Sequence, residues 1–141
     1  MSEWIHMIVP MLVCADPVAE IEFCKTALGA QELSRRVEDG ERVVHATLRI
    51  EECLVMIHCE TDHLASRAPY PDGSSPVVIY LYLEGVDAVV ERAVSAGAKI
   101  VTPLEDQFWG DRMARILDPA GHVWNVASRR DEADGSSAAA L

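Results

Sequence analysis

The residues of this chain that could carry chemistry match no common catalytic motif. The candidate metal-binding side chains are four histidines: His6, His45, His58 and His122. None of their spacings matches the HxH or HxxxH patterns that place two imidazoles on one metal ion. The sequence also lacks a Gly-x-Ser-x-Gly elbow and a glycine-rich phosphate loop. The motifs therefore predict neither a serine nucleophile of that type nor a nucleotide site.

His45 is the candidate for proton transfer, because an imidazole in a cleft titrates near neutral pH. Its partner would be Asp111 or Arg112. The simpler alternative, which we favour, is that His45 is a polar wall residue that is hydrogen-bonded to a neighbour. The sequence leaves both roles open for this histidine.

The chain is strongly acidic. Its 141 residues contain 12 Lys and Arg against 23 Asp and Glu, which gives a formal net charge of -11. This charge repels nucleic acids and anionic membrane surfaces, and it favours cationic partners, although the simpler explanation is a soluble surface. We therefore expect no nucleic-acid partner and no membrane partner.

The sequence predicts a cytoplasmic protein. The N-terminus has no basic region followed by an apolar core, and no apolar run approaches the ~18 residues of a membrane span. The four cysteines show no CxxC spacing: Cys14, Cys24, Cys53 and Cys59. Without a secretory signal, we expect them to be reduced and mostly buried.

A hairpin from Trp109 to Ala127 is the clearest structural pattern. Its turn is Asp118-Pro119-Ala120-Gly121, in which Pro presets one dihedral angle and Gly supplies the positive φ of a tight reversal. Both strands mix polar residues with bulky apolar ones. We therefore expect one face of the hairpin to line a pocket.

The remaining chain predicts two helices and further strands. Asp16 caps the first helix and Pro17 occupies its first position, while Gly29 ends it. The full set of predicted elements is a strand over 5–13, a helix over 17–28, strands over 31–37, 42–50, 53–59 and 77–83, a helix over 86–96, and strands over 99–103, 108–117 and 123–128. The strand over 42–50 alternates apolar and polar residues, so the first helix should cover its apolar face.

The order of these elements repeats once along the chain, which predicts an α+β fold of two tandem βαβββ modules. The predicted organisation is one domain over 1–128, with modules over 5–59 and 76–128, a linker over 60–75 and a mobile tail over 129–141. Two such sheets set edge to edge form a curved, barrel-like mixed sheet with helices outside and a cleft inside. Each module alone exposes a sheet face and edges, so the modules pair within one chain or by exchange between two chains. We expect a homodimer.

The closing hairpin resembles that of the glyoxalase/bleomycin-resistance families of the vicinal oxygen chelate superfamily. The similar residues are Trp109-Gly110-Asp111-Arg112, a spacer, and Asp118-Pro119-x-Gly121-His122-x-Trp124. Residues 44–50 resemble the third strand of that family and residues 16–30 its first helix, so the resemblance covers 5–128. It implies the fold described above but no single reaction, because the superfamily hosts lyases, dioxygenases, epimerases, thiol transferases and drug-binding proteins.

The resemblance also implies four places for the ligands of a divalent metal, on the first and last strand of each module. These places are occupied here by Val9, Met56, Val78 and Asn125. Three of them are apolar and His58 is the only ligand type nearby, so we expect no metal and no cofactor. The alternative is a rearranged site built from the four histidines, in a metal-dependent lyase or dioxygenase.

The expected lining of the cleft favours ligand binding. Met and aromatic side chains suit flat, bulky ligands, although each residue taken singly would also suit a closed core. The predicted ligand-binding residues are His45, Met56, His58, Tyr80, Tyr82, Trp109, Arg112 and Asn125. The leading hypothesis is a metal-independent protein that binds a small organic ligand and sequesters an aromatic or cationic antibiotic or metabolite. The enzyme named above, or an antirepressor or scaffold acting through protein contacts, remains the alternative.

Overall fold

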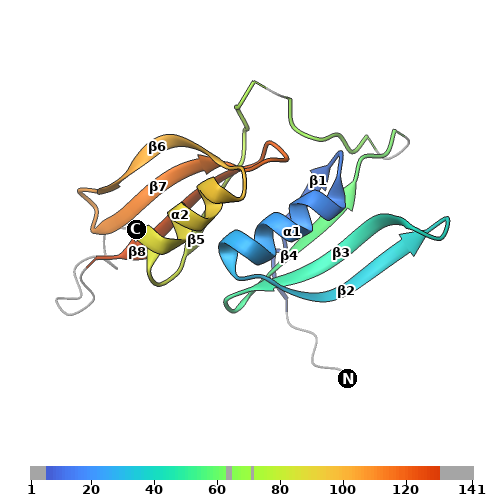
Figure 1. Cartoon of the computed structure of the whole chain (residues 1–141), viewed down its shortest axis with the longest axis horizontal. Helices are drawn as coiled ribbons and strands as arrows, with labels where there is room; N and C mark the ends of the chain where they lie inside the picture. The colour runs from blue at the N-terminus through green and yellow to red at the C-terminus, as the bar shows by residue number, and fades with distance from the viewer. Residues whose placement is uncertain (1–5, 63–64, 71, 131–141) are drawn as a thin grey trace.

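The computed structural model describes residues 6–62, 65–70 and 72–130. Within them the chain forms two four-stranded sheets, each with one helix, and the two helices pack side by side in the middle of the molecule (Figure 1). Sheet 1 and its helix comprise β1 (Met11–Cys14), α1 (Pro17–Leu28), β2 (Gln31–Glu38), β3 (Arg42–Ile50) and β4 (Cys53–Cys59). Sheet 2 and its helix comprise β5 (Val78–Tyr82), α2 (Val86–Ser95), β6 (Lys99–Asp106), β7 (Asp111–Leu117) and β8 (Val123–Arg129).

The two sheets have the same topology, which confirms the predicted α+β fold of two βαβββ modules. The strand order is β1-β4-β3-β2 in sheet 1 and β5-β8-β7-β6 in sheet 2. In each sheet the first strand runs parallel to the last strand, and the other neighbours are antiparallel. No helix in the described part of the chain is long and apolar enough to cross a membrane.

The two helices begin in different ways. Asp16 Oδ1 accepts a hydrogen bond from the Ala19 amide at 3.2 Å, and Pro17 follows it at the first helical position, as predicted for α1. The residue before α2 is Gly85, which has no side chain to cap the helix. Ser128 on β8 replaces the cap, because its Oγ accepts from the Val86 amide at 3.2 Å. The sheet itself therefore holds the start of α2.

Each sheet has a face covered by its helix, called here the helix face, and an opposite open face. On β3 the residues Ala46 and Leu48 are fully buried under α1, whereas His45 and Thr47 between them are only partly buried. Residues that are paired across strands lie on the same face, so the strand register assigns every strand residue to one of the two. The core fills the helix faces of both sheets. The largest side chains buried there are Trp124, Ile21, Leu48, Ile57 and Ile116.

Some predicted boundaries differ from the observed ones. β1 begins at Met11 rather than at residue 5, although residues 1–5 lie outside the described part. β7 begins at Asp111 rather than at residue 108, because a turn precedes it in which the Gln107 amide donates to the Asp111 carbonyl at 2.7 Å. β8 continues through Arg129, so the predicted tail begins too early there, and residues 131–141 lie outside the described part. All four cysteines are free, and only Cys53 is exposed.

Asp118 organises the β7–β8 hairpin. Its Oδ1 accepts from the amides of Ala120 and His122 at 3.0 and 2.8 Å, and its Oδ2 accepts from the Trp124 indole at 2.8 Å. Gly121 has a φ of +98°, and a Cβ there would lie 3.1 Å from Pro69. Only glycine therefore fits this turn, because a side chain would be strained and would displace the linker.

A second carboxyl group, Glu20 on α1, is fully buried near Asp118, where the two modules meet. Neither of its oxygens has a hydrogen-bond partner that meets ordinary geometry within the described residues. Burial, and next the neighbouring Asp118, raise the pKa of Glu20 well above its usual value. The folded protein therefore favours the protonated form of Glu20 more strongly than the unfolded chain does.

This difference predicts a stability that falls as the pH rises from the ordinary Glu pKa toward the raised pKa of the folded state. We expect Glu20→Gln to keep the neutral shape and to raise the free energy of unfolding by about 1–3 kcal/mol at pH 8. At pH 4, below the ordinary pKa of Glu, the gain should nearly vanish. Urea unfolding at both pH values measures it, with Glu22→Gln on the exposed side of α1 as the control. Equal pH dependence in Glu20→Gln and the parent protein would contradict this account.

Candidate functional site

Three aromatic side chains converge on one carboxylate at the open face of sheet 2. The hydroxyls of Tyr80 and Tyr82 donate to Asp111 Oδ2 at 2.6 and 2.8 Å. The Trp109 indole N–H lies 3.0 Å from the same oxygen and 3.0 Å from the Tyr80 hydroxyl oxygen. Asp111 is fully buried. One carboxylate oxygen therefore fixes the position of three rings.

The strand geometry explains why these residues meet. Tyr80 and Tyr82 lie two positions apart on β5, so both point to the same face, and their ring centroids are 5.2 Å apart. Asp111 is the first residue of β7, and Trp109 belongs to the turn just before it. Burial, and next the hydrogen bond to Asp111, raise the pKa of both tyrosines. Both phenols therefore stay protonated and act as donors at neutral pH.

The central strands of sheet 2 add two cations and an amide to this face. Asn125 is paired with Tyr80 on one side and with Arg115 on the other. The Arg115 guanidinium donates to Asn125 Oδ1 at 2.8 Å. Arg129 lies over the Tyr82 ring, with its guanidinium carbon 4.6 Å from the ring centroid. The face thus combines flat aromatic surface with positively charged donors.

Two polar atoms on this face are buried without a partner among the described residues: Asp111 Oδ1 and Arg129 Nη1. The two residues are directly paired across β7 and β8. Buried polar groups in native proteins are nearly always hydrogen-bonded. The face therefore has one acceptor and one donor that its own side chains leave unused.

The predicted residues of sheet 1 form a separate group. His45 on β3 and His58 on β4 are cross-strand partners, and their Nδ1 atoms lie 3.1 Å apart. Met56 is paired with Thr47 and with Met11. All of them lie on the open face of sheet 1. Burial, followed by the charges of His58 and Arg36, lowers the pKa of His45.

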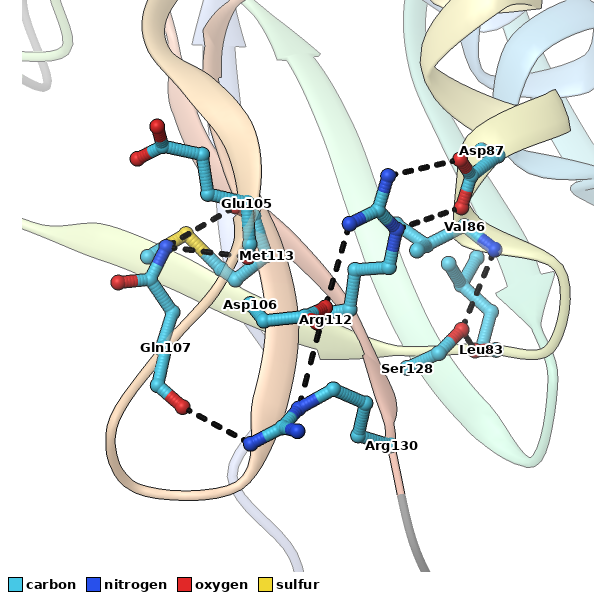
Figure 2. A network of polar contacts seen from close by, with 10 residues as sticks. All are labelled: Leu83, Val86, Asp87, Glu105, Asp106, Gln107, Arg112, Met113, Ser128 and Arg130. Atoms are coloured by element: carbon cyan, nitrogen blue, oxygen red, sulfur yellow. Dashed lines mark hydrogen bonds and ion pairs between the residues drawn. The ribbon is translucent and has the colours of Figure 1, made fainter.

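Arg112, which was predicted to bind the ligand, does not lie with either group of candidate residues. Its guanidinium makes two hydrogen bonds to Asp87 on α2, at 2.9 and 3.0 Å, and one to Asp106 at 3.2 Å (Figure 2). Side chains alternate along a strand, so Asp111 faces the open side and Arg112 faces the helix. The contact with Arg112 lowers the pKa of Asp87. Arg112 therefore ties α2 to sheet 2.

The residues at the four family metal places do not fit a divalent ion. The two metal places of each module should lie side by side on its first and last strands. The register pairs Met56 with Met11 and Asn125 with Tyr80, so the first-strand places are Met11 and Tyr80, two residues after the expected Val9 and Val78. This corrected set still contains no imidazole and no carboxylate. Within the described residues no group of three His, Cys, Asp or Glu side chains is placed to hold a metal. A stable site needs three or four such ligands.

The candidate site also includes residues that the sequence did not identify as ligand-binding. Asp111 was considered only as a partner of His45, yet these residues belong to different sheets. Arg115 and Arg129 were not considered at all. The available signal was spacing: Arg115 lies four positions after Asp111 on β7, so both side chains point to the same face, and Arg129 on β8 is the cross-strand partner of Asp111.

The open face of sheet 2 is bordered by two hollows. Tyr82 and Arg129 border one of about 450 Å³, and Tyr80 borders another of about 440 Å³.

Known proteins place this architecture in a family. The uncharacterised protein Rv0887c of Mycobacterium tuberculosis (strain ATCC 25618 / H37Rv) is 40% identical over 120 residues, which cover 83% of this chain and 71% of that protein. The crystal structure of TioX from Micromonospora sp. ML1 matches with a TM-score of 0.68 and 26% identity, covering 87% of this chain and 95% of that one. The fosfomycin resistance protein FosX from Mesorhizobium loti shares the fold with a TM-score of 0.65 at 15% identity, covering 98% and 99%. The model of the Glyoxalase/Bleomycin resistance protein/Dioxygenase superfamily matches residues 4–126, and the chain belongs to this superfamily.

Proposed function

We propose that this protein binds a small aromatic molecule on the open face of sheet 2, without a metal, and sequesters it. The observation that carries the proposal is the convergence of Tyr80, Tyr82 and Trp109 on Asp111 Oδ2. Membership of a superfamily that includes bleomycin-resistance proteins supports an antibiotic as the ligand. A metabolite of similar shape is the other ligand class.

Fixed rings bind a flat ligand better than mobile ones. Each buried stacking contact contributes about 0.5–1.5 kcal/mol beyond the burial of its area. Because Asp111 already holds the three polar groups, the rings lose little conformational entropy when a ligand arrives. Several such contacts support binding in the micromolar range.

The charges of this face support an aromatic ligand more than a cationic one. The carboxylate of Asp111 has one oxygen engaged by three donors and the other buried. Arg115 and Arg129 lie on the same face of the central strands. A cation would be repelled by both guanidinium groups. A neutral or anionic aromatic molecule with carbonyl, phenolate or carboxylate oxygens would accept hydrogen bonds from them.

Metal independence is supported by the donor set described above, in which Met11, Met56, Tyr80 and Asn125 occupy the family places. We expect elemental analysis of protein purified without an affinity tag to find far less than one equivalent of Zn, Ni, Co, Fe or Mn per chain. One equivalent that disappears in His45→Ala or His58→Ala would instead favour the rearranged site of a lyase or dioxygenase.

We also propose that the protein is a homodimer, in which a second copy covers the outer edges of β1 and β5. Both strands are sheet edges within the chain. Met11 on β1 is exposed, as are Met7 and Ile8 just before that strand. Met7 and Ile8 border the same hollow as the exposed Tyr80 on β5. Unpaired edges with apolar side chains are normally covered in soluble proteins.

Sedimentation equilibrium tests the assembly. We expect a dimer, and we expect Met11→Lys to weaken it at least about tenfold, because a buried charge at an interface costs more than ~1.4 kcal/mol. Val101→Lys on the edge strand β6, which is similarly exposed, is the control. A monomer at all concentrations, or equal effects of the two substitutions, would contradict the proposal.

The ligand proposal is tested with 2-naphthol as a defined aromatic probe and with a thermal-shift screen of aromatic antibiotics and metabolites. Trp109→Ala should weaken binding by about 1 kcal/mol or more, roughly fivefold, because it removes one of the fixed rings. Tyr70→Ala, at an exposed aromatic residue of the linker, is the control and should leave the affinity unchanged. Binding that is indifferent to Trp109, or that maps to the outer surfaces of the helices, would refute the assignment of this face.

A further inference from the structure

The open face of sheet 1 contains a second polar cluster, which the aromatic site on sheet 2 does not use. The rings of His45 and His58 are 5.3 Å apart and nearly perpendicular, and their Nδ1 atoms lie 3.1 Å apart. This separation is that of a hydrogen bond. Both rings are only partly buried, so they are open to a ligand on this face.

A hydrogen bond between two Nδ1 atoms restricts the state of both rings. One ring must carry its proton on Nδ1 and, when neutral, it then has a bare Nε2. The other ring accepts at Nδ1 and carries its proton on Nε2. The neutral pair therefore presents one donor and one acceptor to its surroundings. One added proton turns both Nε2 atoms into donors and gives the pair a positive charge.

The surroundings of the pair are basic. Arg36 on β2 is the direct cross-strand partner of His45, and Arg49 lies on the same face of β3. The register places no Asp or Glu of the four strands on this open face of the described chain, in a protein of net charge -11. The nearest acid to Arg36 is Glu38, 3.8 Å from its Nε and exposed on the same edge strand. His122 contacts the backbone of β1 instead, with its Nε2 2.8 Å from the Val13 carbonyl oxygen.

We propose that His45, His58 and Arg36 form a binding site for an oxyanion, the carboxylate or phosphate group of a small molecule. Guanidinium and imidazole N–H groups are the usual partners of such anions, and Arg binds them with two parallel hydrogen bonds. Burial, and next the charges of His58 and Arg36, already lower the pKa of His45. A bound anion reverses this, so it draws a proton onto the pair and binds more tightly at lower pH.

The site is distinct from the aromatic face of sheet 2, so the two assignments succeed or fail separately. The test uses protein with labelled histidines, in EDTA and at constant ionic strength, titrated with benzoate and followed by NMR of the His45 and His58 rings. Benzoate stays anionic between pH 6 and pH 8, and benzamide is its neutral match. We expect saturable shifts of both rings with benzoate, at least about threefold tighter at pH 6 than at pH 8, and none with benzamide. Inorganic phosphate at pH 6 decides whether the site accepts phosphate as well as carboxylate.

Adjacent arginines on β2 provide matched variants. Arg36→Gln should weaken benzoate binding at least about fivefold. Arg35→Gln should leave it unchanged, because Arg35 is paired with Ala46 on the helix face and bonded to Glu32. Both positions are on an edge strand, and circular dichroism verifies that both variants fold. Equal binding of benzamide and benzoate, equal effects of the two arginines, or binding that requires added Zn²⁺ would overturn the proposal.

Discussion

One constraint governs this fold: each four-stranded sheet has a single helix to cover it. A helix can bury only one face of a sheet, and side chains alternate between the two faces with a period of two. Apolar residues therefore occupy the helix faces, where Leu48, Ile57 and Trp124 are almost completely buried. The opposite faces are left to polar, aromatic and Met side chains. The predicted ligand-binding residues lie on or beside these open faces, except Arg112, which is one position along β7 from Asp111 and faces the helix.

The same constraint explains what the sequence could predict. The strands over 42–50 and 53–59 were predicted to their last residue, since regular alternation and short turns mark them. The predicted start of β7 was wrong because a hydrogen bond between the Gln107 amide and the Asp111 carbonyl closes a turn there. The pattern of apolar and polar residues does not reveal such a contact. Arg112 was expected to point into the cleft but points toward α2. Which β7 residues point to which side depends on how β7 pairs with β8, and the local sequence does not contain that register.

The contacts among the candidate residues were harder to predict than the strands that carry them. Tyr80, Tyr82 and Trp109 were identified as aromatic surface, but the acid that holds them lies about thirty residues away from the tyrosines along the chain. Asp111 reaches both tyrosines because β5 and β7 lie on either side of β8 in the same sheet. The His45–His58 pair has the same origin, since the register of β3 and β4 places the two rings opposite each other. Long-range strand pairing thus creates both clusters.

The two modules repeat one backbone with different side chains, and this difference has a functional meaning. Equivalent rows across the sheets carry Met11, Met56 and Thr47 in the first module, and Tyr80, Asn125 and Arg115 in the second. Neither row contains a carboxylate or an imidazole, which are the usual ligands of a metal site. Sheet 2 instead gathers rings around a buried acid, and sheet 1 gathers bases around a histidine pair. The proposed aromatic site on sheet 2 and the proposed oxyanion site on sheet 1 therefore use different side chains at equivalent places of one repeated scaffold.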